Sequence, residues 1–158
     1  MFAASSFYKP IGNWGVTSVK HMNYIFSGNE DFNKPRNDWN VQKVRSFHAM
    51  FLNNSFNQDN WKVDNAIDMA YMFRAESFNG PYNLEPSQRQ KNEWNVFREI
   101  GDWNVQNVRN TQEMFAGATS FNHGIGDWIV QNMQSMNGMS AGTTSFNQDI
   151  GDWNVQNV

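Results

Sequence analysis

The chain has 158 residues, and 12 Lys plus Arg against 15 Asp plus Glu leave a net charge of −3. This size suits one domain, and the weakly negative charge argues against a nucleic-acid partner. Cysteine is absent, which excludes disulfides and thiolate metal sites, and no apolar run is long enough for direct membrane insertion in this segment.

Tryptophan recurs at a nearly fixed interval. With Trp94 set aside, successive copies are 25, 22, 42, 25 and 25 residues apart, at Trp14, Trp39, Trp61, Trp103, Trp128 and Trp153. A period of this length, with a recurring sequence such as Ile-Gly-Asp-Trp-Asn-Val-Gln-Asn-Val around it, is typical of a repeat array. We therefore expect residues 1–158 to form a single array of about six coils, excerpted from a longer solenoid.

Each repeat divides into two halves. The first half reads Ile-x-x-Trp-x-Val, as at Ile125 to Val130, and apolar residues two apart predict a very short strand. The second half carries apolar residues three apart, as at Val44, Phe47 and Met50, which predicts a short helical or 3-10 turn. The predicted fold class is therefore an α/β repeat solenoid, with short parallel strands on one face and short helical or 3-10 turns on the other.

The chain is rich in side-chain amides, with 24 Asn and 10 Gln. Equivalent residues of stacked coils lie above one another, so the Asn after each repeated Phe could form an amide ladder. These are Asn33, Asn57, Asn79, Asn122 and Asn147. A second Asn directly precedes the apolar residues spaced three apart, which we call the apolar stripe. Its side-chain oxygen could cap free backbone N–H groups there. Examples are Asn65, Asn107 and Asn132.

An insertion interrupts the array at residues 80–99, where the interval from Phe78 to Trp103 is 18 residues longer than in the other units. Its Gly and Pro residues predict a loop at its start. It is either a degenerate partial repeat or a recognition loop, because insertions in repeat arrays collect on one face and often bind. The candidate contact residues are Tyr82, Arg89, Trp94 and Phe97.

A second candidate site is the polar band beside the repeated Trp. The residue before Trp and the residue after it should point away from the core and could bind a glycan or a polar protein edge. The candidate strip consists of Asn40, Lys62, Asp102, Asn104, Asp127, Asp152 and Asn154. The alternative is an ordinary solvated surface.

Three aspartates of this strip occupy equivalent positions in successive repeats: Asp102, Asp127 and Asp152. Calcium bridging between coils is one option, since hard cations favour stacked carboxylates. Exposure with local hydrogen bonding is the other, and we expect no cofactor.

Nothing in the sequence predicts catalysis. The three histidines stand at different places in the repeat, and no metalloprotease, nucleophile-elbow or phosphate-loop motif occurs. We therefore expect a protein that is not an enzyme.

The unit Met-Phe-Ala-Gly-Ala-Thr-Ser-Phe-Asn-His-Gly-Ile-Gly-Asp-Trp-Ile-Val-Gln-Asn-Met, residues 114–133, resembles the repeat of the BspA-like leucine-rich-repeat surface proteins, first noticed in mycoplasma lipoproteins. The resemblance covers nearly all of the chain except the insertion. Gln42, Gln106, Gln131 and Gln156 stand where that family usually has Ser. The resemblance implies a leucine-rich-repeat-like solenoid in a secreted or cell-surface protein that serves adhesion.

Together with this resemblance, the sequence implies a non-enzymatic repeat scaffold for protein or glycan recognition or adhesion at a cell or particle surface. The alternative is a structural or linker subunit of a larger multi-protein assembly. Fold resemblance alone does not identify the ligand.

Overall fold

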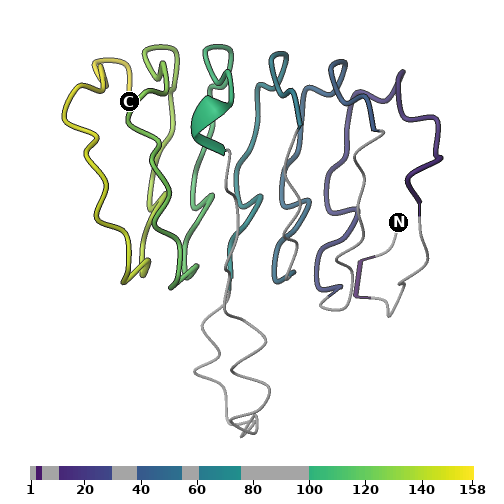
Figure 1. Ribbon diagram of the computed structural model, residues 1–158, viewed down its shortest axis with the longest axis horizontal. Coiled ribbons are helices and arrows are strands. Elements are labelled where there is room, and N and C mark those ends of the chain that lie inside the picture. Colours follow the sequence, from purple (N-terminus) through teal and green to yellow (C-terminus); the bar gives the residue numbers. More distant parts are fainter. Residues whose placement is uncertain (1–2, 5–10, 30–38, 55–60, 76–99) are drawn as a thin grey trace, which may run out of the picture.

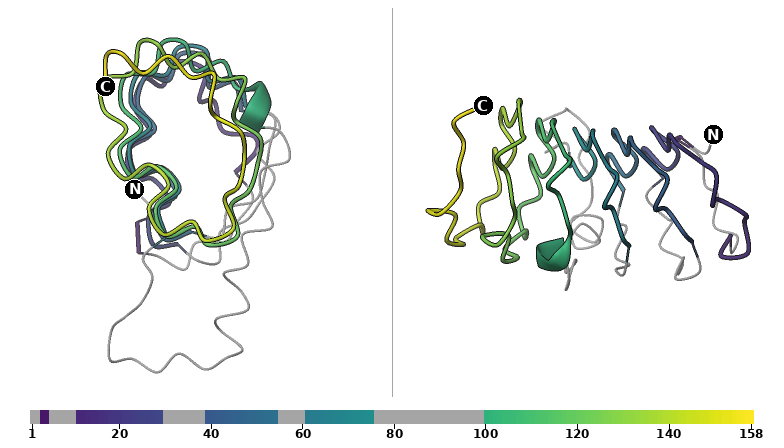
Figure 2. Two further views of the ribbon diagram at one scale, coloured as in Figure 1. Left: turned by 90° about the vertical axis from the view of Figure 1, so that its left-hand side faces the viewer. Right: turned by 90° about the horizontal axis from the view of Figure 1, so that it is seen from above.

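The computed structural model describes residues 3–4, 11–29, 39–54, 61–75 and 100–158. The chain winds through successive coils that stand side by side along the long axis of the molecule (Figure 1). Seen along this axis, the described parts of the coils overlie one another (Figure 2). Residues one coil apart in the sequence are therefore neighbours in space.

The predicted α/β solenoid is wrong, because regular secondary structure is nearly absent from the described residues. Their one helix is the 3-10 helix η2, Ile100–Asp102, which lies in a segment predicted to be a strand. The segments predicted to be helical carry isolated parallel bridges that form no strand. These bridges are His21↔Ser46, Ser46↔Asp68, Asp68↔Asn110 and Asn110↔Ser135.

Alternating backbone hydrogen bonds explain why neither helix nor strand forms. After each bridge the chain makes consecutive turns closed by bonds from residue i+3 to residue i. One coil has Met50 N to Phe47 O at 3.0 Å, Leu52 N to Ala49 O at 3.3 Å and Asn54 N to Phe51 O at 3.1 Å. The intervening amides donate to the next coil instead: Phe47 N to Asp68 O, Ala49 N to Ala70 O, Phe51 N to Met72 O and Asn53 N to Arg74 O, at 2.8–3.0 Å. Half of the amides in this segment thus point along the stack, so no helical ladder can propagate.

Residues in the left-handed backbone conformation make this alternation possible. An equivalent position in five coils has a positive φ, at Tyr24 (56°), Ala49 (49°), Tyr71 (58°), Glu113 (49°) and Gly138 (61°). In four of these coils the residue four positions later also has a positive φ, at Gly28, Asn53, Gly117 and Gly142. A non-glycine residue in this conformation costs about 1–2 kcal/mol. The cost is offset because each of the four non-glycine residues at the first position donates its N–H to a carbonyl of the next coil, at 2.9–3.0 Å.

The core is a stack of aromatic rings along the coil axis. Phe26, Phe51, Phe73 and Phe115 follow one another at centroid distances of 5.8, 5.8 and 5.9 Å, with interplanar angles of 9° or less. The predicted apolar stripe is also buried, and Val44, Phe47 and Met50 have no exposed surface. The residues of this stripe are three apart because they lie in successive turns closed by bonds from residue i+3 to residue i. The same spacing would occur in a helical turn, so the sequence does not distinguish the two.

At Trp39, Trp128 and Trp153 the indole N–H connects its coil to the preceding one. Trp128 Nε1 donates to the carbonyl of Ile100 at 2.8 Å, and Trp39 Nε1 donates in the same way to Ile11 at 2.8 Å. The Ile100 carbonyl also accepts the backbone N–H of Trp103 at 3.1 Å. The segment Ile-x-x-Trp is therefore a turn whose carbonyl serves two coils, and not the predicted strand.

The glycine before Asp-Trp allows close approach of the next coil. A Cβ added at Gly126 would lie 2.5 Å from the carbonyl oxygen of Asp149, and one at Gly101 would lie 2.5 Å from that of Gly124. Both obstacles are backbone atoms, which cannot move aside as a flexible side chain can.

Trp128 should be a major determinant of stability. Its side chain is 3% exposed and stacks on Trp153 at 6.4 Å with parallel planes. Trp128→Ala should lower the free energy of unfolding by about 3–5 kcal/mol in chemical denaturation, because it leaves a large cavity and removes the indole donor. A loss below about 1 kcal/mol would contradict a buried, stacked indole.

The tight glycine contact gives a second prediction. Gly126→Ala should destabilise the protein by about 1–3 kcal/mol, because the new methyl group would overpack against the Asp149 backbone. Gly15→Ala is the matched control, since nothing lies within 4 Å of its added Cβ. Equal melting temperatures for the two variants would show that the coils do not approach as closely as described.

Candidate functional site

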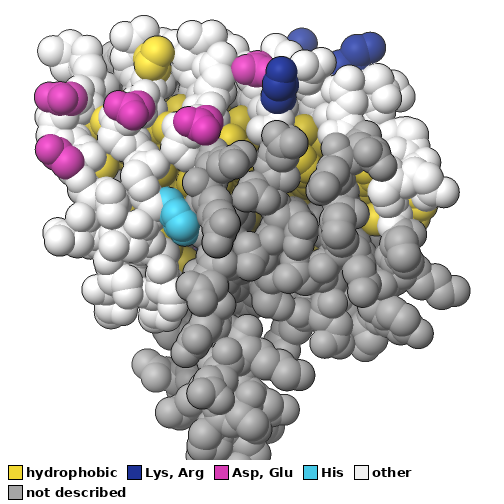
Figure 3. All heavy atoms as spheres, viewed as in Figure 1, with side chains coloured by type: hydrophobic (Ala, Val, Ile, Leu, Met, Phe, Trp, Pro, Cys, Tyr) yellow, Lys and Arg dark blue, Asp and Glu magenta, His cyan; other side chains and the backbone are white. Residues whose placement is uncertain are grey.

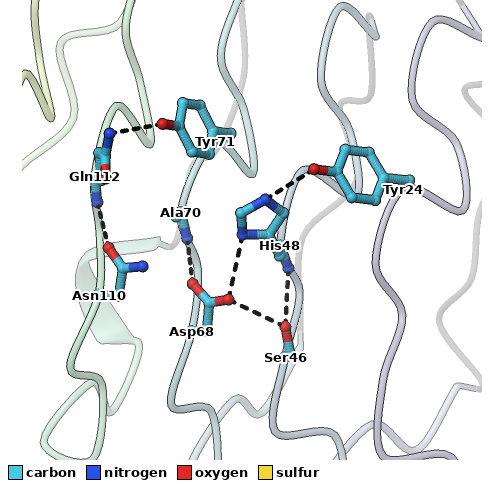
Figure 4. A network of polar contacts seen from close by, with 8 residues as sticks. All are labelled: Tyr24, Ser46, His48, Asp68, Ala70, Tyr71, Asn110 and Gln112. Carbon is cyan, nitrogen blue, oxygen red and sulfur yellow. Dashed lines mark hydrogen bonds and ion pairs between the residues drawn. The ribbon is translucent and has the colours of Figure 1, made fainter.

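A polar network links four successive coils (Figure 4). The imidazole of His48 lies at its centre, with Nδ1 3.2 Å from Asp68 Oδ2 and Nε2 3.0 Å from the Tyr24 hydroxyl. Tyr24 and Asp68 come from the coils on either side of His48. The bridge register brings the three together, because it pairs Ser46 with His21 on one side and with Asp68 on the other.

The same residues form a column of rings on the surface. The His48 ring lies between those of Tyr24 and Tyr71, at centroid distances of 5.3 and 5.4 Å. Arg74 lies 5.7 Å from the centre of the Tyr71 ring and pairs with Glu113 Oε2 at 3.3 Å. Tyr24 is 48% exposed, so this end of the column offers an accessible aromatic surface. We call Tyr24, His48, Tyr71 and Asp68 the aromatic cluster.

Hydrogen bonds hold the polar groups of the cluster in place. Asp68 Oδ1 accepts the N–H of Ala70 at 3.0 Å, and its Oδ2 accepts the Ser46 hydroxyl at 3.4 Å. One coil further on, Asn110 Oδ1 accepts the N–H of Gln112 at 3.0 Å, and Gln112 Nε2 donates to the Tyr71 hydroxyl at 2.6 Å. Side chains held by their own backbone lose little freedom when a ligand binds.

The predicted polar strip is exposed, but its asparagines already have a structural role. Asn40, Asn104 and Asn154 each accept the N–H of the Gln two residues later, at 3.1–3.3 Å, which closes a local turn. The charged members are exposed as predicted: Lys62, Asp102, Asp127 and Asp152. Figure 3 shows acidic side chains gathered over the C-terminal coils.

Calcium bridging of Asp102, Asp127 and Asp152 stays a prediction. No group of three or more His, Asp or Glu residues within the described part of the chain is arranged to hold a metal ion. No helix among these residues is long and apolar enough to cross a membrane.

The predicted insertion contacts Tyr82, Arg89, Trp94 and Phe97 lie outside the described residues.

The asparagines predicted to cap the apolar stripe act differently. Their Nδ2 groups donate to backbone carbonyls of the preceding coil, from Asn65 to Gln42, Asn107 to Asp64 and Asn132 to Gln106, at 2.7–2.8 Å. Asn157, which was not predicted as a cap, donates in the same way to Gln131 at 2.7 Å. They are donors between coils rather than caps within one. Of the ladder predicted after Phe, the described pair is Asn122 and Asn147, where Asn122 Oδ1 accepts the backbone N–H of Asn147 at 2.9 Å.

The aromatic cluster was not predicted from the sequence, where His48 was compared only with the other two histidines and not with the tyrosines one coil away. Tyr24, His48 and Tyr71 are 24 and 23 residues apart, which is close to one coil. Bulky side chains that differ from the repeat yet lie one coil apart are expected to touch. That spacing was the available signal.

A family model described as "Mycoplasma protein of unknown function, DUF285" matches residues 1–87 and, a second time, residues 82–158. No curated protein and no solved structure matches the chain.

The network predicts one tautomer of His48. The Asp68 carboxylate can only accept, so the neutral ring should carry its proton on Nδ1 and accept the Tyr24 hydroxyl at Nε2. Nitrogen-15 NMR of the neutral ring should show the Nδ1–H form, and Asp68→Ala should remove this preference. A ring protonated at Nε2 in the wild-type protein would contradict the network.

Proposed function

We propose that this chain, which belongs to the DUF285 family of mycoplasma BspA-like repeat proteins, is a non-enzymatic scaffold for recognition. The function of that family is unknown. Its partner would be a protein or a glycan, met at a cell or particle surface in the course of adhesion. Nothing in the family match names a partner, so the proposal is argued from the surface of the coils.

The aromatic cluster is the observation that carries this proposal. Its three rings cross three coils on one surface, and carboxylate, amide and phenol groups adjoin them. Aromatic rings supply large contact area at little entropic cost, and the polar groups beside them fix orientation. This combination suits a ligand with both apolar faces and hydroxyl or amide groups.

The hydrogen-bond pattern favours binding over catalysis. The Ser46 hydroxyl donates to Asp68, and the Nε2 of His48 faces a phenol. A serine nucleophile would need its hydroxyl on the imidazole, with the carboxylate on the other ring nitrogen. Ser46 instead accepts the backbone N–H of His48 at 3.4 Å, which makes it part of the local turn.

Binding to an array of glycans and cell-surface proteins tests the proposal. The protein should be displayed as a multimer, because a single shallow site is weak and avidity raises the apparent affinity. Tyr24→Ala should weaken binding of the captured partner about tenfold or more, because Tyr24 is the most exposed ring of the cluster. Ile129→Ala, at a similarly exposed apolar side chain outside the aromatic cluster, is the control and should leave binding unchanged.

Two results would contradict the aromatic cluster as the binding surface. In the first, binding survives Tyr24→Ala and is lost after Lys62→Ala, which would show that the predicted strip is the binding surface. Recovery of the protein only in a stoichiometric complex, without binding to any array member, would favour the structural-subunit alternative.

A further inference from the structure

A polar groove crosses the three C-terminal coils and shares no lining residue with the aromatic cluster. Its volume is about 510 Å³, and it is lined by Asn107, Arg109, Asn132, Gln134 and Asn157. All five side chains are exposed, and none is apolar. The register of the coils places the three asparagines in one column, one from each coil.

The asparagine column is held rigidly. Each Nδ2 donates to a carbonyl of the preceding coil, at 2.7–2.8 Å, which fixes the orientation of the amide. An amide has two N–H groups and an acceptor oxygen, so one N–H and the oxygen of each Asn remain for a ligand. The column therefore offers paired donors and acceptors repeated at the spacing of the coils.

Arg109 adds a single positive charge beside the asparagine column. Its backbone carbonyl accepts the N–H groups of Gln134 and Ser135, at 2.8 and 3.1 Å, which anchors the residue between coils. Its guanidinium makes no ion pair or hydrogen bond within the described part of the chain. A guanidinium that is free to pair binds a carboxylate through two parallel hydrogen bonds.

The surrounding charge limits what this groove can accept. Residues 100–158 contain Arg109 as their one Lys or Arg, against five acidic residues: Asp102, Glu113, Asp127, Asp149 and Asp152. A densely charged polyanion would be repelled by this field. A peptide would need apolar pockets for anchor side chains, and the lining of the groove supplies none.

We propose that the groove binds a glycan with sparse carboxylates, such as alternating uronic acid and N-acetylated sugars. Arg109 would pair with a uronate carboxylate, and the three asparagines would bond hydroxyl and acetamido groups of neighbouring sugars. The site is separate from the aromatic cluster, so this proposal can fail while the proposed function stands.

Titration with a hyaluronan hexasaccharide, followed by NMR, tests the groove directly. The side-chain amide signals of Asn107, Asn132 and Asn157 should shift on binding. Arg109→Gln should weaken binding about 10- to 100-fold, the value of a charge-assisted hydrogen bond. Gln134→Glu, which keeps the size of the side chain but adds a negative charge, should weaken binding as well.

Arg45→Gln is the matched control. Arg45 is exposed and stands at the equivalent position of an earlier coil, where its carbonyl accepts Ile67 and Asp68 N–H groups as that of Arg109 accepts Gln134 and Ser135. Lys43 there replaces the asparagine of the column, so this change should leave binding of the hexasaccharide unaltered.

Three outcomes would overturn the proposal. Equal binding of the carboxyl-reduced hexasaccharide would show that Arg109 recognises no carboxylate. Binding of hexaglutamate but not of the glycan would assign the groove to an acidic peptide. Hexasaccharide binding that leaves the three asparagine signals unmoved, or no binding at all, would remove the groove as a glycan site.

Discussion

The fold depends on one interaction, the backbone hydrogen bond that joins alternate residues of one coil to the next. Each of the four described interfaces contains four such donors after the bridge, as between Thr111, Glu113, Phe115 and Gly117 and the carbonyls of the following coil. Every donor fixes the distance between two coils at one point. Because the donors alternate with turn-closing amides, the backbone is satisfied without forming a helix or a sheet.

Side-chain packing follows from this spacing. Aromatic rings at equivalent positions are carried to 5.8–5.9 Å from one another, within the range in which offset rings attract. The repeated indole uses its N–H on the carbonyl of the preceding coil, and the glycine at positions such as Gly126 leaves room for the neighbouring backbone. Aromatic and amide side chains can therefore replace the leucines of a more usual core. This chain has only two leucines.

Some of this could be predicted from the sequence. The recurrence of Trp indicates a repeat, and the stripe at Val44, Phe47 and Met50 is buried as expected. The backbone conformation could not be predicted from spacing, because residues three apart are neighbours in consecutive turns as well as in a helix. Residues such as Tyr71 and Glu113 have no local preference for positive φ, so their conformation comes from bonds to the next coil. The spacing of Tyr24, His48 and Tyr71 is close to one coil and could have indicated the aromatic cluster, but its hydrogen bonds follow from the register of the bridges.

The surface chemistry is a consequence of the same register. Stacking carries unlike side chains at adjacent positions into contact, so Tyr24, His48 and Asp68 meet, and it carries like side chains into rows, as in the asparagine column. A scaffold of this kind can hold several different recognition surfaces without changing its core.

Amide hydrogen exchange tests the central claim most directly. The N–H groups of Phe51, Phe73 and Phe115 bond across coils, so their exchange requires separation of two coils and should approach the rate of global unfolding. The N–H groups of Leu52 and Arg74 close turns within one coil and should exchange faster by local opening. Slower exchange at Leu52 and Arg74 than at the three phenylalanines would contradict the account, because it would place the stabilising bonds within the coils.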